Sequence, residues 1–316
     1  MIDHAENARK YLKNADIFMG SISSEERFDR GWIISTDNGI RIKKKIIYYF
    51  NEVLKASHDR SAEERRFDTT FQLTEQDKKL YVDIYNEVEG LTAFKDCIKD
   101  DLTKFHDKKI LLDFSVMIKP YFFLLLKYLS TIPLKELYLL YTEPSLYDEF
   151  TRGTISGKDV PGYSGAKDPT KKDALILLLG FEGDRALEVL NEVSPNLTIP
   201  VNGFPAYRPV FKDRSILENK ILLEEEDIFK NLRFAPANDP FETKKVLEDI
   251  YSEFRNEYNI SVAPLGTKPM ALGSCLFALE HSECRIIYPY PMEYLPKSSL
   301  GWGNTWIYVM KFLNDI

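Results

Sequence analysis

Apolar residues along this chain gather in short continuous runs, with little strict alternation of apolar and polar positions. Each run has the length of a strand and is bounded by polar residues, glycine or proline. Such runs are typical of strands that are covered on both faces in a parallel sheet. The run at 46–50 also fits a short helix. The runs lie at residues 15–20, 46–50, 110–114, 136–141, 174–179, 197–201, 260–265, 284–288 and 305–310.

Between these runs, apolar residues recur at helical spacing. Strands that alternate with helices in this way predict one Rossmann-like α/β domain across residues 1–316, with a mostly parallel sheet and helices on both faces. Residues 56–73 are charged and poorly periodic, so we expect a surface connection there. No internal repeat of fixed period is present in the sequence. The predicted helices lie at 74–88, 121–129, 183–193, 215–229, 241–258 and from Pro269 to about residue 279.

Residues 145–173 are rich in glycine, proline and lysine and show no periodicity. A polar loop of this length is uncommon inside a compact domain. It is therefore expected to be an insertion, a functional lid, or a boundary between two α/β halves.

Composition narrows the classes of function. The chain of 316 residues has a formal net charge of −7 and a pI of about 5.4, which argues against general nucleic-acid binding. Its three cysteines lack metal-ligand spacing, so no metal site is predicted and a reducing cytoplasm is expected. The start of the chain does not resemble a signal peptide, and the longest apolar run, 120–126, is far shorter than the ~20 residues that span a bilayer. We therefore expect no membrane association.

The turn Gly266-Thr267-Lys268 is the strongest candidate for chemistry. It separates the apolar run 260–265 from a helix that starts at Pro269. A helix start presents free backbone N–H groups and a positive dipole end, and Lys268 adds a full charge. Gly266 allows close approach to the backbone, and Thr267 offers a hydroxyl. These features predict a phosphate site, although an ordinary turn with a surface lysine has the same sequence. The Walker pattern is absent.

In a parallel sheet, every turn from strand to helix lies on one edge, where ligands bind. The turns that follow the predicted strands carry several ionisable residues. Arg27 or Arg185 is expected to supply a second positive contact, and Ser115 a polar one. If the protein is an enzyme, Glu25, Asp113 or Glu182 would act as general base or nucleophile, with Mg²⁺ as a candidate cofactor. Glu25 and Asp113 also fit the simpler role of helix capping.

The stretch VAPLGTKPMALGSCLF, Val262–Phe277, resembles the ligand motif of the CRISPR-associated Rossmann-fold (CARF) sensor domains. In that family a strand ends in a Thr-Gly-Gly-Thr-Lys type of turn, followed by methionine and a helix of small residues. The resemblance implies a defence-associated sensor that binds cyclic oligoadenylates in a homodimer cleft. By the same match, the ligand contacts would be Gly266, Thr267, Lys268 and Met270. Leu265 and Pro269 depart from the family pattern.

Three functions remain open from the sequence. The first is a cytoplasmic protein that binds or senses a nucleotide or another phosphorylated ligand. The second is an enzyme, a hydrolase or transferase, that acts on a phosphorylated nucleoside or sugar. The third is an interaction protein whose site has lost its function.

Overall fold

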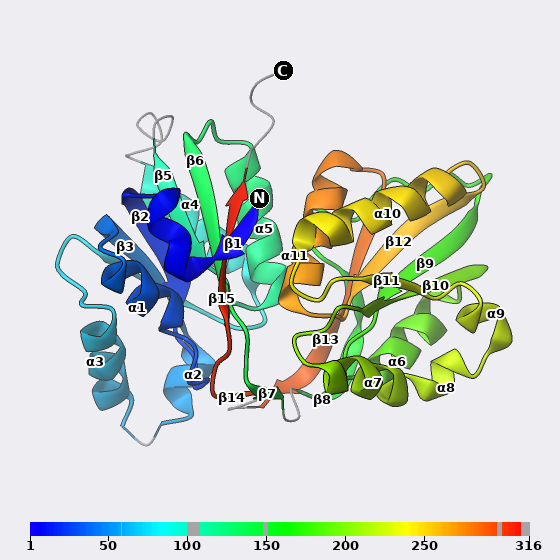
Figure 1. The fold of residues 1–316 in the computed structure, drawn as a ribbon, viewed down its shortest axis with the longest axis horizontal. Helices are drawn as coiled ribbons and strands as arrows, with labels where there is room; N and C mark the ends of the chain where they lie inside the picture. The colour runs from blue at the N-terminus through cyan, green and yellow to red at the C-terminus, as the bar shows by residue number, and fades with distance from the viewer. Residues whose placement is uncertain (58, 100–107, 148–150, 296–298, 311–316) are drawn as a thin grey trace. The chain divides into compact units, whose positions relative to one another are not determined.

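The computed structural model describes residues 1–57, 59–99, 108–147, 151–295 and 299–310, and the chain forms two compact units. Unit 1 is Met1–Phe150 with Leu295–Ile316, and unit 2 is Thr151–Tyr294. Each unit has its own mostly parallel sheet with helices on both faces, which confirms the Rossmann-like α/β class (Figure 1). The strands that the sequence assigned to one sheet therefore belong to two. No helix in the described ranges has both the length and the apolar character needed to cross a membrane.

Unit 1 contains a seven-stranded sheet in the order β1-β15-β6-β5-β2-β3-β4. Strands β6, β5, β2, β3 and β4 are parallel, whereas β15 and β1 are antiparallel to their neighbours. The bounds are β1 Ile2–His4, η1 Ala5–Lys10, β2 Asn14–Ser21, α1 Arg30–Asp37, β3 Arg41–Phe50, α2 Asn51–Lys55, α3 Arg60–Thr70, β4 Lys78–Val82, α4 Glu87–Ile98, β5 Lys109–Asp113, α5 Lys119–Ser130, β6 Glu136–Thr142, β7 Leu146–Tyr147, β14 Ser299–Leu300 and β15 Thr305–Met310.

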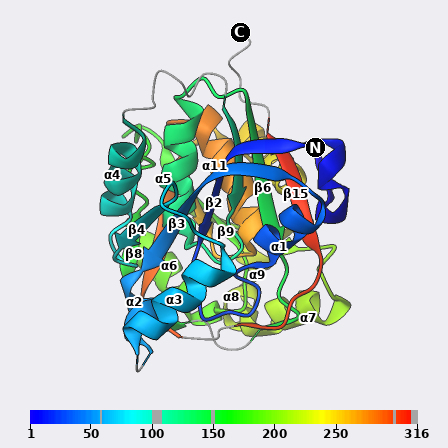
Figure 2. The same ribbon diagram turned by 90° about the vertical axis from the view of Figure 1, so that its left-hand side faces the viewer.

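The chain first builds outward from β2 to β3 and β4, and then returns to place β5 and β6 on the other side of β2. Helices α1 and α3 cover one face of this sheet, and α4 and α5 cover the other (Figure 2). The direction of winding changes between β2 and β5. In open α/β sheets, the crevice at such a switch point is where ligands bind.

Unit 2 contains a six-stranded sheet in the order β11-β10-β9-β12-β13-β8, in which only β8 is antiparallel. The switch point lies between β9 and β12. The bounds are β8 Thr151–Asp159, β9 Lys172–Leu178, α6 Gly183–Val193, β10 Leu197–Gly203, α7 Pro209–Glu218, α8 Lys220–Leu223, α9 Glu226–Phe229, β11 Arg233–Ala235, α10 Pro240–Phe254, β12 Tyr258–Pro264, α11 Lys268–Glu280 and β13 Arg285–Tyr294.

The two units share one topology. The parallel strands run in the order β4-β3-β2-β5-β6 in unit 1 and β11-β10-β9-β12-β13 in unit 2. An antiparallel strand flanks the last parallel strand in each unit, β15 beside β6 and β8 beside β13. The chain is thus a structural tandem repeat, although the sequence shows no repeat of fixed period.

Three predicted segments differ from the structure. Residues 74–88 were expected to be helical, but they contain β4 and only the start of α4. The apolar spacing there is misleading because Leu80 and Val82 are buried on one face of a strand, while Val88 is 51% exposed. Residues 56–73 contain α3, whose only buried residue is Phe67. Residues 145–173 contain β8, an edge strand whose backbone pairing with β13 needs no apolar pattern.

Helix α11 carries the predicted turn of unit 2 and is apolar on every side. It is enclosed because it packs against α10, where a β-carbon at Gly273 would lie 2.6 Å from the carbonyl oxygen of Pro240. Glycine at this position therefore allows the two helices to approach closely. This packing fixes where the first turn of α11 lies at the edge of the sheet.

The start of α10 depends on a side-chain cap. The Asp239 carboxylate accepts hydrogen bonds from the backbone N–H groups of Phe241 and Glu242, at 2.9 and 3.1 Å. We expect Asp239→Ala to lower the free energy of unfolding by ~1 kcal/mol, as loss of an N-cap usually does. Chemical denaturation measures this loss. Asp239→Asn, which keeps the acceptor, should stay close to the wild type, and equal losses in both variants would contradict the capping role.

Candidate functional site

The predicted phosphate turn of unit 2 lies at the switch point of its sheet. Pro264 ends β12, and Lys268 is the first residue of α11. Thr267 caps this helix, since its Oγ1 accepts from the N–H of Met270 at 3.3 Å and donates to the carbonyl of Ala237. The hydroxyl hydrogen that the sequence assigned to a ligand is therefore used within the fold. The side chains of Thr267 and Lys268 are partly exposed at this turn.

The loop after β9 packs directly against this turn. A β-carbon at Gly180 would lie 2.4 Å from the carbonyl oxygen of Leu265, so only glycine permits the contact. The Gly180 carbonyl in turn accepts a 2.8 Å hydrogen bond from Asn219. Met270 is fully buried, and its sulfur would lie 3.0 Å from a β-carbon at the buried Gly266. Met270, which the family resemblance predicts as a ligand contact, therefore supports the turn from below.

Unit 1 has a matching helix start that the sequence analysis missed. Strand β5 occupies the position that β12 has in unit 2, and the helix that follows it, α5, begins with Lys119-Pro120. Helix α11 begins with Lys268-Pro269. Lys119 and Lys268 are both partly exposed. The repeated Lys-Pro pair before an apolar helix is a sequence signal that could have identified Lys119.

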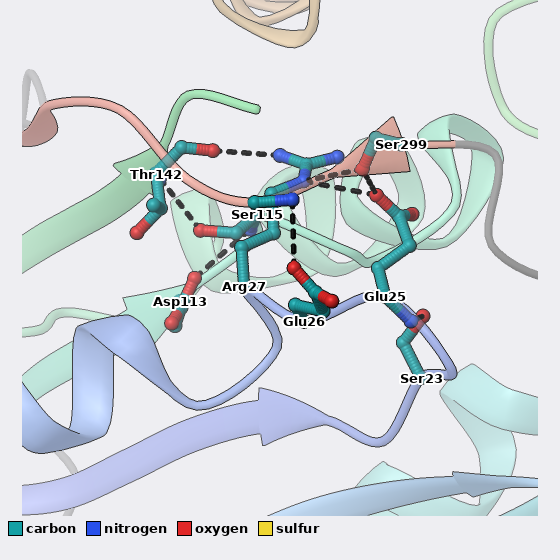
Figure 3. A network of polar contacts seen from close by, with 9 residues as sticks. Ser23, Glu25, Glu26, Arg27, Asp113, Ser115, Thr142 and Ser299 are labelled. Carbon is teal, nitrogen blue, oxygen red and sulfur yellow. Dashed lines mark hydrogen bonds and ion pairs between the residues drawn. The ribbon is translucent and has the colours of Figure 1, made fainter. Parts of the chain in front are cut away.

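Arg27 is the centre of a buried polar network in unit 1, shown in Figure 3. It is only 4% exposed and follows β2 in the chain. Its Nε lies 2.9 Å from the Glu25 carboxylate and 3.3 Å from the Ser299 hydroxyl, and its Nη1 donates to the carbonyl of Thr142 at 2.6 Å. Arg27 thus ties the loop after β2 to the end of β6 and to β14.

Arg185 forms the corresponding network in unit 2. It is 6% exposed and follows β9, the counterpart of β2. Its Nη1 pairs with Glu182 at 2.5 Å, and its Nη2 donates to the carbonyl of Pro289 in β13, the counterpart of β6. Each unit therefore contains a buried glutamate–arginine pair that fastens the first loop to the last parallel strand. We call these two pairs, with the carbonyl that each arginine contacts, the arginine latches.

Tyrosines complete the repeat. The Arg27 guanidinium lies 5.8 Å from the Tyr141 ring centre, and the Arg185 guanidinium lies 5.4 Å from that of Tyr288. In each unit this tyrosine precedes the carbonyl that accepts from the arginine. Both belong to the pattern Tyr-x2-Pro-x2-Tyr, which occurs as Tyr141–Tyr147 (YTEPSLY) and Tyr288–Tyr294 (YPYPMEY). This short pattern is the counterpart, in the sequence, of the structural repeat.

The latches keep both arginines charged. Burial acts to lower the pKa of Arg27, but Glu25, Tyr141 and Tyr147 together raise the pKa above its ordinary value. Burial also acts to lower the pKa of Arg185, and Tyr288 and Glu182 reverse this effect. The sequence assigned both arginines to ligand contact. The structure places them inside the protein, where they hold the loops of the switch points in position.

Asp113 and Ser115 are also used internally. Ser115 is fully buried, its Oγ accepts from the N–H of Thr142 at 2.8 Å, and its own N–H donates to Asp113 at 2.9 Å. A β-carbon at Gly31 would lie 2.1 Å from Asp113 Oδ2, so this carboxylate packs against the first turn of α1. Ser115 was predicted as a ligand contact, but its side chain connects β5 to the end of β6.

The three candidate catalytic carboxylates fall in two different sheets. Glu25 and Asp113 belong to unit 1, and Glu182 belongs to unit 2. Glu25 and Glu182 are each paired with an arginine, at 2.9 and 2.5 Å. Among the described residues, no group of three or more histidine, cysteine, aspartate or glutamate side chains could hold a metal ion.

Residues 299–302, which precede β15, contact the loop after β2 in unit 1. The Ser299 hydroxyl donates to Glu25, and the N–H of Gly301 donates to Glu26 at 2.8 Å (Figure 3). The Trp302 ring lies 3.8 Å from the guanidinium of Arg30. Two segments far apart in the sequence thus meet over the carboxyl end of β2.

Comparison with known proteins identifies a structural neighbour. No protein-family model and no curated protein sequence matches the chain. A solved structure described as "Structure of a Type III CRISPR defence DNA nuclease activated by cyclic oligoadenylate" matches with a TM-score of 0.52 and 9% sequence identity. The match covers 87% of this chain and spans about 65% of that chain. At this identity the likeness establishes a shared fold.

Proposed function

We propose that this protein is a CARF-like sensor in which each unit binds a nucleotide at its own Lys-Pro helix start. The observation that carries the proposal is the repeat: Lys268 and Lys119 occupy the same topological position, next to the switch point, in both units. A single lysine at a helix start is common, whereas its recurrence at equivalent positions indicates a shared use. The match of Val262–Phe277 to the CARF ligand motif supports the same use.

Charge and backbone geometry favour a phosphorylated ligand at these positions. The first N–H groups of a helix have no partner within the helix and point toward the incoming anion, and the dipole adds a positive potential. A lysine at the first helical position supplies a full charge beside them. In unit 2, Gly266, the backbone of Thr267 and Lys268 would hold the phosphate. The arginine latches would keep the neighbouring loops in place.

The structural neighbour suggests which class of ligand to test first. That protein is described as activated by cyclic oligoadenylate, and because the two proteins share a fold, the same class is the first to test here. Cys275 and Cys284 are buried and form no disulfide, which fits a cytoplasmic site of action. Homodimer formation, which the family resemblance implies, stays a prediction, as does the absence of general nucleic-acid binding.

Ligand binding can be tested with a panel of phosphorylated compounds. The panel contains cyclic oligoadenylates of several ring sizes, AMP, ADP, ribose 5-phosphate and inorganic phosphate, each with and without Mg²⁺. We expect at least one nucleotide to raise the melting temperature, because a ligand that binds only the folded state stabilises it. Chromatography should recover that nucleotide unchanged. A panel without any stabilising compound would contradict the proposal.

The same samples distinguish the sensor from the enzyme. Product formation that disappears in Glu25→Gln or Asp113→Asn, while binding is retained, would replace the sensor proposal by the enzymatic one. Glu182→Gln provides the same test in unit 2.

A further inference from the structure

A hollow of about 280 Å³ lies beside the carboxyl end of β10 in unit 2. It is lined by residues 204–206, which follow β10, and by Pro209, Lys212 and Asp213 in the first turns of α7. Its volume is slightly below the range of roughly 300–1,000 Å³ that is typical of small-molecule sites. It can therefore hold part of a ligand, such as one ring system.

One wall of the hollow is the aromatic ring of Phe204, which is 51% exposed. Phe234, in β11, does not line the hollow, but its ring meets that of Phe204 edge to face with centroids 6.1 Å apart. The Lys212 ammonium lies 5.6 Å from the Phe204 ring centre. Exposed aromatic rings combined with a cation form the surface on which proteins stack nucleobases.

This wall is connected to the phosphate turn through the backbone of one residue, Ala237. The carbonyl of Ala237 accepts from the hydroxyl of Thr267 and, at 3.0 Å, from that of Tyr207. The N–H of Ala237 donates to the carbonyl of Pro205, which lines the hollow, at 2.9 Å. Ala237 therefore links the phosphate turn to the loop that lines the hollow.

From these contacts we propose that the hollow is the base subsite of the nucleotide site. The base stacks on Phe204 beside Lys212, while the phosphate lies at Thr267 and Lys268. This inference rests on the proposed function and adds to it the chemical group that the second part of the site recognises, an aromatic base. Because the base would stack on Phe204, a nucleotide would be preferred over a sugar phosphate, which has no base.

The test compares AMP with ribose 5-phosphate, which lacks the base, by calorimetry. We expect the wild type to bind AMP at least about tenfold more tightly, and Phe204→Ala to reduce AMP affinity by about tenfold, in the range measured for loss of one base–aromatic stack. Ribose 5-phosphate should bind the wild type and the variant alike. Phe204→Trp should retain AMP binding. Phe229→Ala, which removes an exposed ring that does not line the hollow, should leave both affinities unchanged.

The outcomes separate the two proposals. If Phe204→Ala weakens both ligands equally, or neither, the base subsite is rejected. If Lys268→Ala still abolishes ribose 5-phosphate binding in that case, the phosphate site stands without the base subsite. If neither compound binds the wild type, the base subsite falls together with AMP as a ligand, and the cyclic oligoadenylate arm of the panel decides the proposed function.

Discussion

Replacing Arg27 with alanine is expected to lower the stability of unit 1 by about 3–5 kcal/mol, the usual loss when one partner of a buried ion pair is removed. The substitution leaves the Glu25 carboxylate, whose side chain is 12% exposed, without its cation. It also leaves the carbonyl of Thr142 without its 2.6 Å donor. Because the chain has two units, hydrogen exchange is the suitable measurement. Protection should fall around residues 22–29 and 141–147.

Two variants serve as controls for this result. Replacing both partners, with Glu25→Gln and Arg27→Met, should recover most of the stability, since no buried charge then remains unpaired. Arg66→Ala removes a pair with Glu63 in which the arginine side chain is 47% exposed, and it should cost less than about 1 kcal/mol. If Arg27→Ala and Arg66→Ala have equal effects, the latch does not hold the loop.

Arg185→Ala should have the same effect in unit 2, with lost protection confined to the loop after β9 and to β13. The Glu182 side chain is 22% exposed, against 12% for Glu25, so a somewhat smaller loss is expected. Parallel behaviour of the two variants would support a common structural role for the two arginines.

The sequence predicts the strands of this fold better than their arrangement. Continuous apolar runs such as 174–179 and 260–265 mark buried strands because parallel strands are covered on both faces. The runs carry no information on pairing partners, however, so strands of two sheets were assigned to one. The edge strand β8 was not predicted because its sequence, TRGTISGKD, has no continuous apolar run. Its backbone pairing with β13 needs none.

The candidate site was also predictable only in part, because local sequence shows a turn but not the contacts between distant residues. The turn at Gly266–Lys268 follows from local sequence, since a strand, a glycine and a helix start are adjacent in the chain. Arg27 looked like a ligand contact because a charged residue at a sheet edge is usually exposed. Its partners at Thr142 and Ser299 are distant in sequence, and only the folded structure shows that they bury it.

The structural repeat distinguishes the role of the arginines from that of the lysines, although the sequence predicted Arg27, Arg185 and Lys268 alike as ligand contacts. The arginines are buried and paired with glutamates within each unit, whereas the lysines at the helix starts remain partly exposed. A rigid edge is useful for binding because groups that are already in position lose little entropy when a ligand arrives. The arginine latches thus act on binding through the loops they hold, and the lysines act by direct contact.

Lys268→Ala should weaken binding of the nucleotide identified by the panel by about 10- to 150-fold, which corresponds to about 1.5–3 kcal/mol for a lost charge-assisted hydrogen bond. Lys119→Ala should weaken binding at the corresponding helix start of unit 1 in the same direction, and calorimetry at several salt concentrations measures both effects. Affinity of the wild type should fall as salt rises, and this dependence should be shallower in each variant because one screened charge is gone.

Lys230→Ala is the matched control, because it removes the same charge from an exposed pair with Asp227 elsewhere in unit 2. It should leave affinity unchanged at every salt concentration. A loss as large as that of Lys268→Ala would mean that net charge alone attracts the ligand. Unchanged affinity in Lys268→Ala would remove this lysine from the site proposed in unit 2. Unchanged affinity in Lys119→Ala would remove Lys119 from the site proposed in unit 1, and the repeated helix start would then be a feature of folding.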